Sequence, residues 1–293
     1  MLRALTLLAL AAVPAATART HGGTPVYFAA VPELHALIEL DSGGAVLGRI
    51  HVAGRPQYVA AAYPGGRAVV LAAGTGGVAI VDARTRRALA TLRFVSAPRS
   101  LDVVNPVRAY IVDSARGNLA VVDIGTPRKL GRLRVGARPV AIAFASVGVL
   151  WVVHESGPVT VDGRPVRGTA GARDVAATRD GAAWIALRER VVRIARGRRR
   201  TIAVRATQLV PDDASAGVFA VEPARGRIVF LSPAGRIVHV YRGCPGARAV
   251  APVGGASVVA ACRVGVAIYG RAGGAPSIVR LGAAPSGVAV AVL

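Results

Sequence analysis

The side chains that most often carry catalysis or metal binding are sparse and scattered in this chain. No two of the five histidines, His154 among them, stand at a spacing that would place them in one ligand set. The motifs of metalloproteases, serine hydrolases, phosphate-binding loops and calcium loops are absent. Gly74-Thr75-Gly76-Gly77 precedes a predicted strand, so it lacks the helix N-terminus of a phosphate cradle. We therefore predict no cofactor, no metal and no catalytic motif.

A set of polar residues recurs at the predicted ends of strands that lie second from the centre of a ring. Such a set could converge on one face and supply acid/base groups or metal ligands. Those strands lie about 4.8 Å outside the innermost ones, however, and diverge outward. Direct ligation of one ion by several of these side chains is therefore disfavoured, and we expect solvated loop residues. The set is Asp113, His154, Glu155, Arg188, Glu189 and Glu222.

Arginine recurs at a second place, the corner that leads into each predicted innermost strand. Several guanidinium groups around the mouth of a central channel would repel one another unless an anion lay between them, and the arginine fork suits phosphate or carboxylate. The alternative is that these side chains extend into solvent as part of a general arginine excess. The predicted ligand-binding residues are Arg55, Arg99, Arg138, Arg173 and Arg248.

Both sets follow from an internal repeat. Leu37–Asp41, Val78–Asp82 and Leu119–Asp123 are copies of one phrase whose last residues are 41 positions apart. The corner recurs seven times, at steps of 34 to 42 residues, and each period holds four short β-branched or alternating runs without a helical pattern. This pattern predicts an all-β protein, a seven-bladed β-propeller with four-stranded antiparallel blades.

The two ends of the chain are predicted to complete one blade. Ser286–Leu293 reads as an innermost strand with no second strand after it, and Val26–Ala30 reads as a second strand with no innermost strand before it. Their pairing would close the ring and remove open sheet edges. Blades four and five are expected to be degenerate between Asp162 and Val204.

Tyr110–Asp113, Val121–Asp123 and Val135–Pro139 resemble the YVTN β-propeller repeats, whose phrases run roughly YVTN, VIDT and VGxxP. The resemblance covers about Val26 to Leu293 and is sharp only from Leu37 to Val153, and the asparagine of the signature is absent. It implies a secreted or surface-exposed binding or scaffold protein, similar in fold to seven-bladed lactonases and streptogramin lyases. An enzyme of that type, the alternative to a binding protein, would use His154, Glu155, Glu189 and Glu222.

The first 18 residues read as a secretory signal, with a basic start, the apolar run Ala4–Val13 and a small-residue cleavage site ending at Ala18. Residues 19–293 would form the propeller domain, without a transmembrane segment, in a secreted or extracytoplasmic space. There a hairpin with a turn at Gly254-Gly255 would place Cys262 opposite Ala247 or Arg248, within a few residues of Cys244, and a disulfide is favoured over free thiols.

The charge balance points to an anionic partner. The chain has 37 Lys+Arg against 15 Asp+Glu, a net charge of +22, and only 4% aromatic residues. We expect a monomer that binds an anionic small molecule, a cell-envelope polymer or another protein; nucleic acid is disfavoured, because side chains that stack on bases are few. A second basic surface is predicted in turns on the opposite face, from Arg84, Arg86, Arg87, Arg128, Lys129, Arg196 and Arg198 to Arg200.

Overall fold

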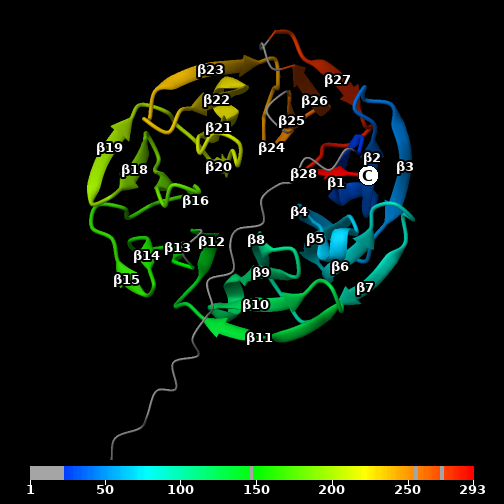
Figure 1. Ribbon diagram of the computed structural model, residues 1–293, viewed down its shortest axis with the longest axis horizontal. Helices are drawn as coiled ribbons and strands as arrows, with labels where there is room; N and C mark the ends of the chain where they lie inside the picture. The colour runs from blue at the N-terminus through cyan, green and yellow to red at the C-terminus, as the bar shows by residue number, and fades with distance from the viewer. Residues whose placement is uncertain (1–22, 146–147, 254–256, 271–273) are drawn as a thin grey trace, which may run out of the picture.

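The computed structural model describes residues 23–145, 148–253, 257–270 and 274–293. The predicted signal of residues 1–18 and the predicted Gly254-Gly255 turn lie outside the described residues. Seven four-stranded antiparallel sheets stand around a central axis, as Figure 1 shows, which confirms the predicted seven-bladed propeller. We number the blades one to seven in chain order.

The first three blades have their strands in a regular order from the centre outward. Blade one, which both ends of the chain build, consists of β28 (Gly287–Val292), β1 (Pro25–Val31), β2 (Ala36–Leu40) and β3 (Val46–His51). Blade two consists of β4 (Arg55–Ala62), β5 (Val69–Thr75), β6 (Gly77–Asp82) and β7 (Ala88–Leu92). Blade three consists of β8 (Pro98–Asn105), β9 (Arg108–Asp113), β10 (Asn118–Asp123) and β11 (Arg128–Arg134).

The other four blades follow the same order. Blade four consists of β12 (Pro139–Phe144), β13 (Leu150–His154), β14 (Thr160–Val161) and β15 (Arg164–Pro165), and blade five of β16 (Asp174–Ala177), β17 (Ala183–Ala186), β18 (Val191–Ala195) and β19 (Arg198–Ile202). Blade six consists of β20 (Gln208–Pro211), β21 (Val218–Glu222), β22 (Arg227–Leu231) and β23 (Ile237–Arg242). Blade seven consists of β24 (Ala249–Val253), β25 (Ser257–Cys262), β26 (Gly265–Gly270) and β27 (Ser277–Arg280). Short 3-10 turns are η1 (Pro32–Leu34), η2 (Pro64–Gly66), η3 (Ser114–Arg116) and η4 (Pro223–Arg225).

Each middle strand supplies apolar side chains to two cores, one on either side of its blade. In β5, Val70 and Ala72 pack toward blade one, whereas Leu71 and Ala73 pack toward blade three. Successive side chains of a strand point to opposite faces, so a blade that is covered on both faces needs an uninterrupted apolar run. Small Ala and Val residues fill these interfaces, which explains a strongly apolar chain with few aromatic residues.

The ring closes where β28 pairs antiparallel with β1, from Pro25 opposite Val292 to Ala30 opposite Gly287. The Val292 N–H also donates to the Tyr63 hydroxyl oxygen, 2.7 Å away, which ties the closing strand to blade two. This pairing confirms the predicted closure by the two ends of the chain. Among the described residues, no helix is long and apolar enough to cross a membrane.

Two details differ from the sequence-based expectation. Blade four is reduced, with only two residues in each of its outer strands, but blade five is regular, with strands of four to five residues. Its Val191–Ala195 and Arg198–Ile202 form a hairpin around Arg196 and Gly197, both with positive φ. Much of the second basic surface also lies within outermost strands rather than turns, because β11 begins at Arg128 and β19 at Arg198.

Candidate functional site

The strand order defines two faces of the disc. The corner face carries the connections between blades and the turns between second and third strands; the opposite face carries the remaining turns. Arg55 begins β4, and Arg99 is the second residue of β8. Each of the other three predicted arginines is the residue directly before an innermost strand. All five side chains are exposed: Arg55, Arg99, Arg138, Arg173 and Arg248.

Two of the five corner arginines have carboxylate partners on the same face. Arg55 lies 3.6 Å from Glu33, and Arg138 forms an ion pair with Glu155. Both pairs are exposed to solvent, where an ion pair contributes about 0 to 1 kcal/mol and exchanges readily with another anion. For Arg99, Arg173 and Arg248, no ion pair occurs among the described residues.

Arg138 differs from the other corner arginines in its backbone. Its φ is 45°, in the left-handed region that residues with a side chain seldom adopt. The amides of Arg173 and Arg248 donate to Ala186 and Ala261 at 2.8 and 2.9 Å, whereas in the described part of the chain the Arg138 amide makes no hydrogen bond. A strained residue with a free donor at the surface is a feature that often marks a functional position.

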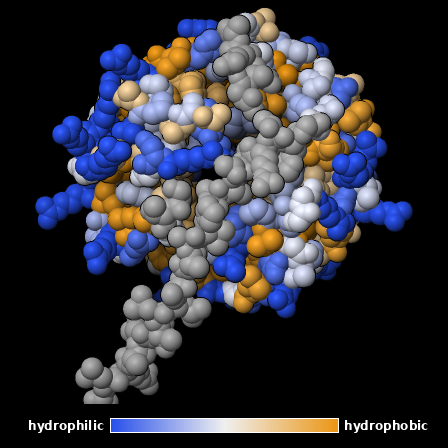
Figure 2. Space-filling model, viewed as in Figure 1, coloured by the Kyte–Doolittle hydropathy of each residue, from blue (hydrophilic) through white to orange (hydrophobic). Residues whose placement is uncertain are grey.

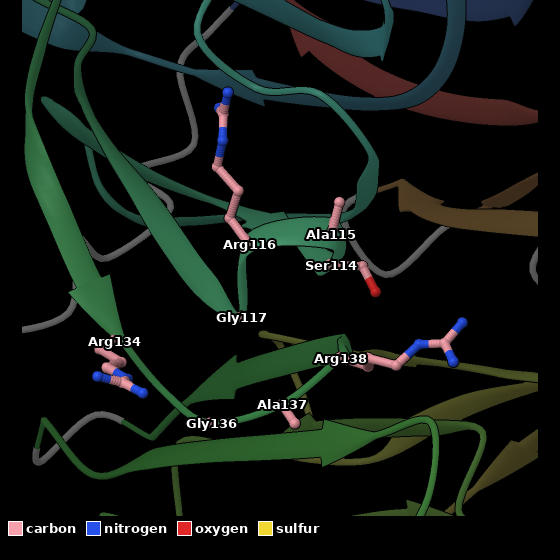
Figure 3. A pocket seen from close by; sticks show the side chains of 8 residues that line it. All are labelled: Ser114, Ala115, Arg116, Gly117, Arg134, Gly136, Ala137 and Arg138. Atoms are coloured by element: carbon pink, nitrogen blue, oxygen red, sulfur yellow. The ribbon is translucent and has the colours of Figure 1, made fainter.

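Arg138 borders a hollow of about 300 Å³ between blades three and four. η3 and Gly117 form one wall, and the chain from Arg134 to Arg138 forms the other. Gly117 and Gly136 face each other across it, and Arg116, Arg134 and Arg138 extend from its edge in different directions (Figure 3). A Cβ on Gly117 would lie 2.6 Å from the Gly136 carbonyl oxygen, so only glycine permits this close approach of the two walls.

The three arginines of this hollow differ in how firmly they are held. Arg116 donates to the Phe94 carbonyl oxygen at 2.8 Å and to Asp113 at 3.2 Å, so it is fixed. Arg138 has only its exposed partner Glu155, and Arg134 has no ion pair within the described residues. The hollow is therefore bordered by one held guanidinium and two that are able to turn toward an anion.

A second hollow, of about 390 Å³, lies on the same face between blades four and five. Gly168, Ala170 and Gly171 line one side, and the turn from Leu187 to Arg190 lines the other. Here Glu189 pairs with Arg205 at 2.5 Å and lies 3.8 Å from Arg188. The lining of this hollow thus includes one carboxylate, Glu189, beside Arg188 and Arg190, whereas the charged residues that line the first hollow are all arginines.

Polar residues at the ends of second strands form hydrogen bonds to the corner of their own blade, the connection that leads into the innermost strand. Asp113, which is fully buried, accepts from the Ser96 hydroxyl at 3.0 Å and from the Arg116 side chain. His154 Nδ1 donates to the Ala137 carbonyl oxygen at 3.1 Å, and its Nε2 lies 3.0 Å from the Thr160 hydroxyl. These groups tie the strand end to the connection that enters the innermost strand.

In blades six and seven, the residue at the end of the second strand also bonds to the connection that leads into the innermost strand. Glu222, 1% exposed, accepts from the Arg205 backbone N–H at 2.8 Å and pairs with the Arg227 side chain. In blade seven the equivalent residue is Cys262, and a disulfide joins it to Cys244. We call these four arrangements corner ties; the residues at the strand ends are Asp113, His154, Glu222 and Cys262.

The corner ties and ion pairs bear on the residues of the enzyme alternative. His154 and Glu222 are buried in corner ties. Glu155 and Glu189 form ion pairs with Arg138 and Arg205. These residues come from blades four, five and six, and each is engaged by partners near its own corner. Among the described residues, no group of three or more His, Cys, Asp and Glu is arranged to hold a metal ion. This arrangement does not favour an active site.

Two aspartates of the innermost strands, Asp102 in β8 and Asp174 in β16, were not singled out from the sequence. Asp102 accepts from the Phe144 N–H of blade four at 3.2 Å, and Asp174 accepts from the Leu209 N–H of blade six at 2.7 Å. Both residues are half-buried in innermost strands, and the neighbouring strands around the axis desolvate their carboxyl groups. Each aspartate thus links its blade to the next.

These surroundings shift the titration of the aspartates. Burial raises the pKa of Asp102 to about 6 and that of Asp174 to about 7, and the charge of Asp102 raises the Asp174 pKa further. Burial also raises the pKa of the Tyr58 hydroxyl in β4, which the nearby Arg99 guanidinium partly offsets. The available signal was an acidic residue within or at the start of a predicted innermost strand, because a carboxylate that is half-buried there must find a donor.

The comparisons with known proteins support the fold. No protein-family model matches the chain, and no curated protein matches it, so the resemblance to YVTN repeats stays a prediction. A functionally unknown protein from Desulfotomaculum acetoxidans is similar in structure, with a TM-score of 0.74, 12% identity, and coverage of 91% of this chain and 99% of that one. Apo AztD from Citrobacter koseri has a TM-score of 0.70 at 11% identity over 92% and 98% of the two chains. Kuenenia stuttgartiensis hydrazine synthase has a TM-score of 0.67 at 16% identity over 80% and 89%. At these identities the likeness extends to the β-propeller fold alone.

Proposed function

We propose that this protein is an exported binding protein that engages an anionic ligand or an anionic cell-envelope polymer through its corner face. The observation that carries the proposal is the arginine-bordered hollow between blades three and four. It combines three guanidinium groups, a close approach of two glycine-bearing walls, and Arg138 in a strained backbone conformation with a free amide.

The chemistry of the hollow suits oxyanions. A guanidinium fork and a backbone N–H donate to phosphate or carboxylate oxygens, and these charge-assisted hydrogen bonds are roughly twice as strong as neutral ones. Glu155 is exposed, so an incoming anion can replace it at Arg138 at little energetic cost. The remaining corner arginines would attract a long polyanion to the same face and guide it to this hollow.

The experiment uses short-chain polyphosphate as a polymeric probe, inorganic phosphate as a monomeric one, and neutral dextran as the uncharged comparison. We expect the chain lacking residues 1–18 to bind polyphosphate and not dextran, and Arg134→Ala/Arg138→Asn to lower the affinity about tenfold. Asparagine is chosen because it tolerates the left-handed backbone at position 138. A variant with Arg134→Ala and Arg138→Lys should bind more tightly than Arg134→Ala/Arg138→Asn, because lysine keeps the charge at position 138 without the fork.

A matched control removes the same charge from the opposite face. Arg84 and Arg87 are exposed residues of the turn before β7, so Arg84→Ala/Arg87→Ala should leave polyphosphate affinity near that of the unmodified protein. Equal losses in the two double variants would mean that binding follows net charge alone, and the corner face would lose its role. Binding of inorganic phosphate as tightly as polyphosphate would indicate a small-molecule ligand rather than a polymer.

A further inference from the structure

The outer rim of the disc carries a strand whose free edge is long, basic and exposed. β11 has seven residues, Arg128–Arg134, and is the longest outermost strand in the described part of the chain. It lies at the end of its sheet, in the order β11, β10, β9, β8, so one row of its backbone donors and acceptors has no strand beside it. Figure 2 shows hydrophilic side chains projecting around the rim with hydrophobic patches between them.

The two sides of β11 differ in chemistry, and the register with β10 shows which is which. Lys129, Arg132 and Arg134 lie opposite Val122, Ala120 and Asn118. Val122 and Ala120 pack into the core toward blade two, so the basic residues belong to that side of the sheet. Lys129 accordingly stands 5.7 Å from the centre of the Phe94 ring, and Arg132 donates to the Phe94 carbonyl oxygen at 3.0 Å.

The other side of the strand is open and mostly apolar, with Arg128 at its beginning, opposite Asp123. Leu133 and Gly131 lie opposite Leu119 and Val121, and Leu119 packs into the core toward blade four. Leu133 is 43% exposed, and no atom lies within 4 Å of the place where a Gly131 Cβ would stand. A glycine inside an exposed strand allows another backbone to approach closely.

The charge of β11 is largely uncompensated and determines what could pair with it. The strand holds four basic residues and no acidic one, and among the described residues the one carboxylate that pairs with it is Asp123, 3.9 Å from Arg128. A second copy of β11 would place arginine and lysine opposite arginine and lysine, which opposes self-pairing. An acidic strand meets no such repulsion.

We propose that β11 is a docking edge for an extended segment of a partner protein in which acidic and apolar residues alternate. The segment would add a fifth strand to blade three by β-augmentation, with acidic side chains beside Arg132 and Arg134 and apolar side chains beside Gly131 and Leu133. Before Gly131 the register between β11 and β10 shifts, so the segment would need a matching irregularity to place a further acidic side chain beside Lys129. Backbone hydrogen bonds would supply affinity, and the period-two pattern would supply specificity. This inference does not require polyanion binding at the corner face, but β11 shares Arg134 with that hollow, so the variants that test the edge change Lys129 and Arg132.

The test compares three synthetic peptides of equal length and charge by fluorescence anisotropy at physiological salt. One alternates glutamate and valine, one places all glutamates before all valines, and one is the alternating peptide N-methylated at every second residue. We expect the alternating peptide to bind at least about tenfold more tightly than the other two, because only it satisfies the backbone edge and both faces. Equal binding of all three would overturn the proposal and leave only charge attraction.

Variants of the protein locate the edge. Lys129→Glu/Arg132→Glu should lower the affinity for the alternating peptide about tenfold or more, whereas Arg84→Glu/Arg87→Glu changes the charge equally outside any strand edge and should not. Hydrogen exchange provides a readout that needs no variant: β11 amides should become protected when the peptide binds. Protection elsewhere, with β11 unchanged, would contradict the proposal. Arg116→Ala/Arg138→Asn should leave peptide binding intact, which separates this edge from the corner face.

Discussion

At the scale of single residues, arginine has a structural task in this protein besides any ligand. Arg49 donates to the Leu34 carbonyl oxygen at 2.6 Å, Arg199 to that of Arg167 at 2.6 Å, and Arg200 to that of Ala234 at 2.5 Å. A long side chain with five donors can reach the carbonyl groups of turns and connections that lie outside the strands. Part of the positive charge is thus tied to the fold, and the residues that lack such a bond stand out as candidates for binding.

The buried and exposed glutamates should differ sharply in their effect on stability. Glu222→Ala removes the partner of both the Arg205 amide and the Arg227 side chain in an environment where Glu222 is 1% exposed. We expect the free energy of unfolding to fall by about 3 kcal/mol. Glu155→Ala removes only an exposed ion pair and should cost less than about 0.5 kcal/mol. Urea denaturation measures both, and similar costs would contradict the corner tie at Glu222.

The innermost aspartates should make stability depend on pH. Their folded pKa values, about 6 and about 7, lie above the ordinary value of 3.8. Between these values the folded protein keeps protons that the unfolded chain has released, so this contribution to the free energy of unfolding falls as the pH rises from about 4 to about 7. Asp174→Asn keeps an oxygen acceptor for the Leu209 N–H but cannot ionise. We expect urea denaturation at pH 5 and pH 8 to show a smaller difference in this variant, and an unchanged difference would contradict the assignment.

At the scale of elements, the repeat made the strands predictable and left the site largely unpredicted. Val78–Asp82 matches β6 closely because an apolar run between two turns can only be a buried strand in a repeat of this length. The hollow depends on how closely Gly117 approaches Gly136, and the pairing of Arg138 with Glu155 depends on side-chain directions. Neither is encoded in periodicity. The left-handed backbone of Arg138 is likewise invisible in the sequence, because its neighbours resemble those of the other corners.

The disulfide corner tie should contribute about as much to stability as the noncovalent corner tie at Glu222. It joins residues 18 positions apart, and closing a loop of that size stabilises a protein by about 3 kcal/mol through the unfolded chain. We expect Cys244→Ser/Cys262→Ser to lower the free energy of unfolding by about this amount, while the native blade arrangement persists. Thermal melts with and without a reducing agent check this prediction. If the reducing agent left the melting temperature of the unmodified protein unchanged, the prediction would be contradicted.

At the scale of the whole molecule, stability rests on closure of the ring. β28 fills the innermost place of a blade whose other strands come from the opposite end of the chain, and it also contacts β4 of blade two. Deletion of residues 287–293 would expose the edge of β1 and open two blade interfaces. We expect the truncated chain to lose its cooperative thermal transition and to associate. Circular dichroism with light scattering tests this, and a cooperative monomer would contradict the account.

The proposed polyanion site of this protein is the arginine hollow of the corner face. The most direct measurement is the slope of log Kd against log salt for short-chain polyphosphate, because that slope reports how many charge contacts the complex makes. If the hollow binds polyphosphate, the slope should be smaller by about two in Arg134→Ala/Arg138→Asn than in the unmodified protein, and unchanged in Arg84→Ala/Arg87→Ala. Equal slopes in all three proteins would contradict it.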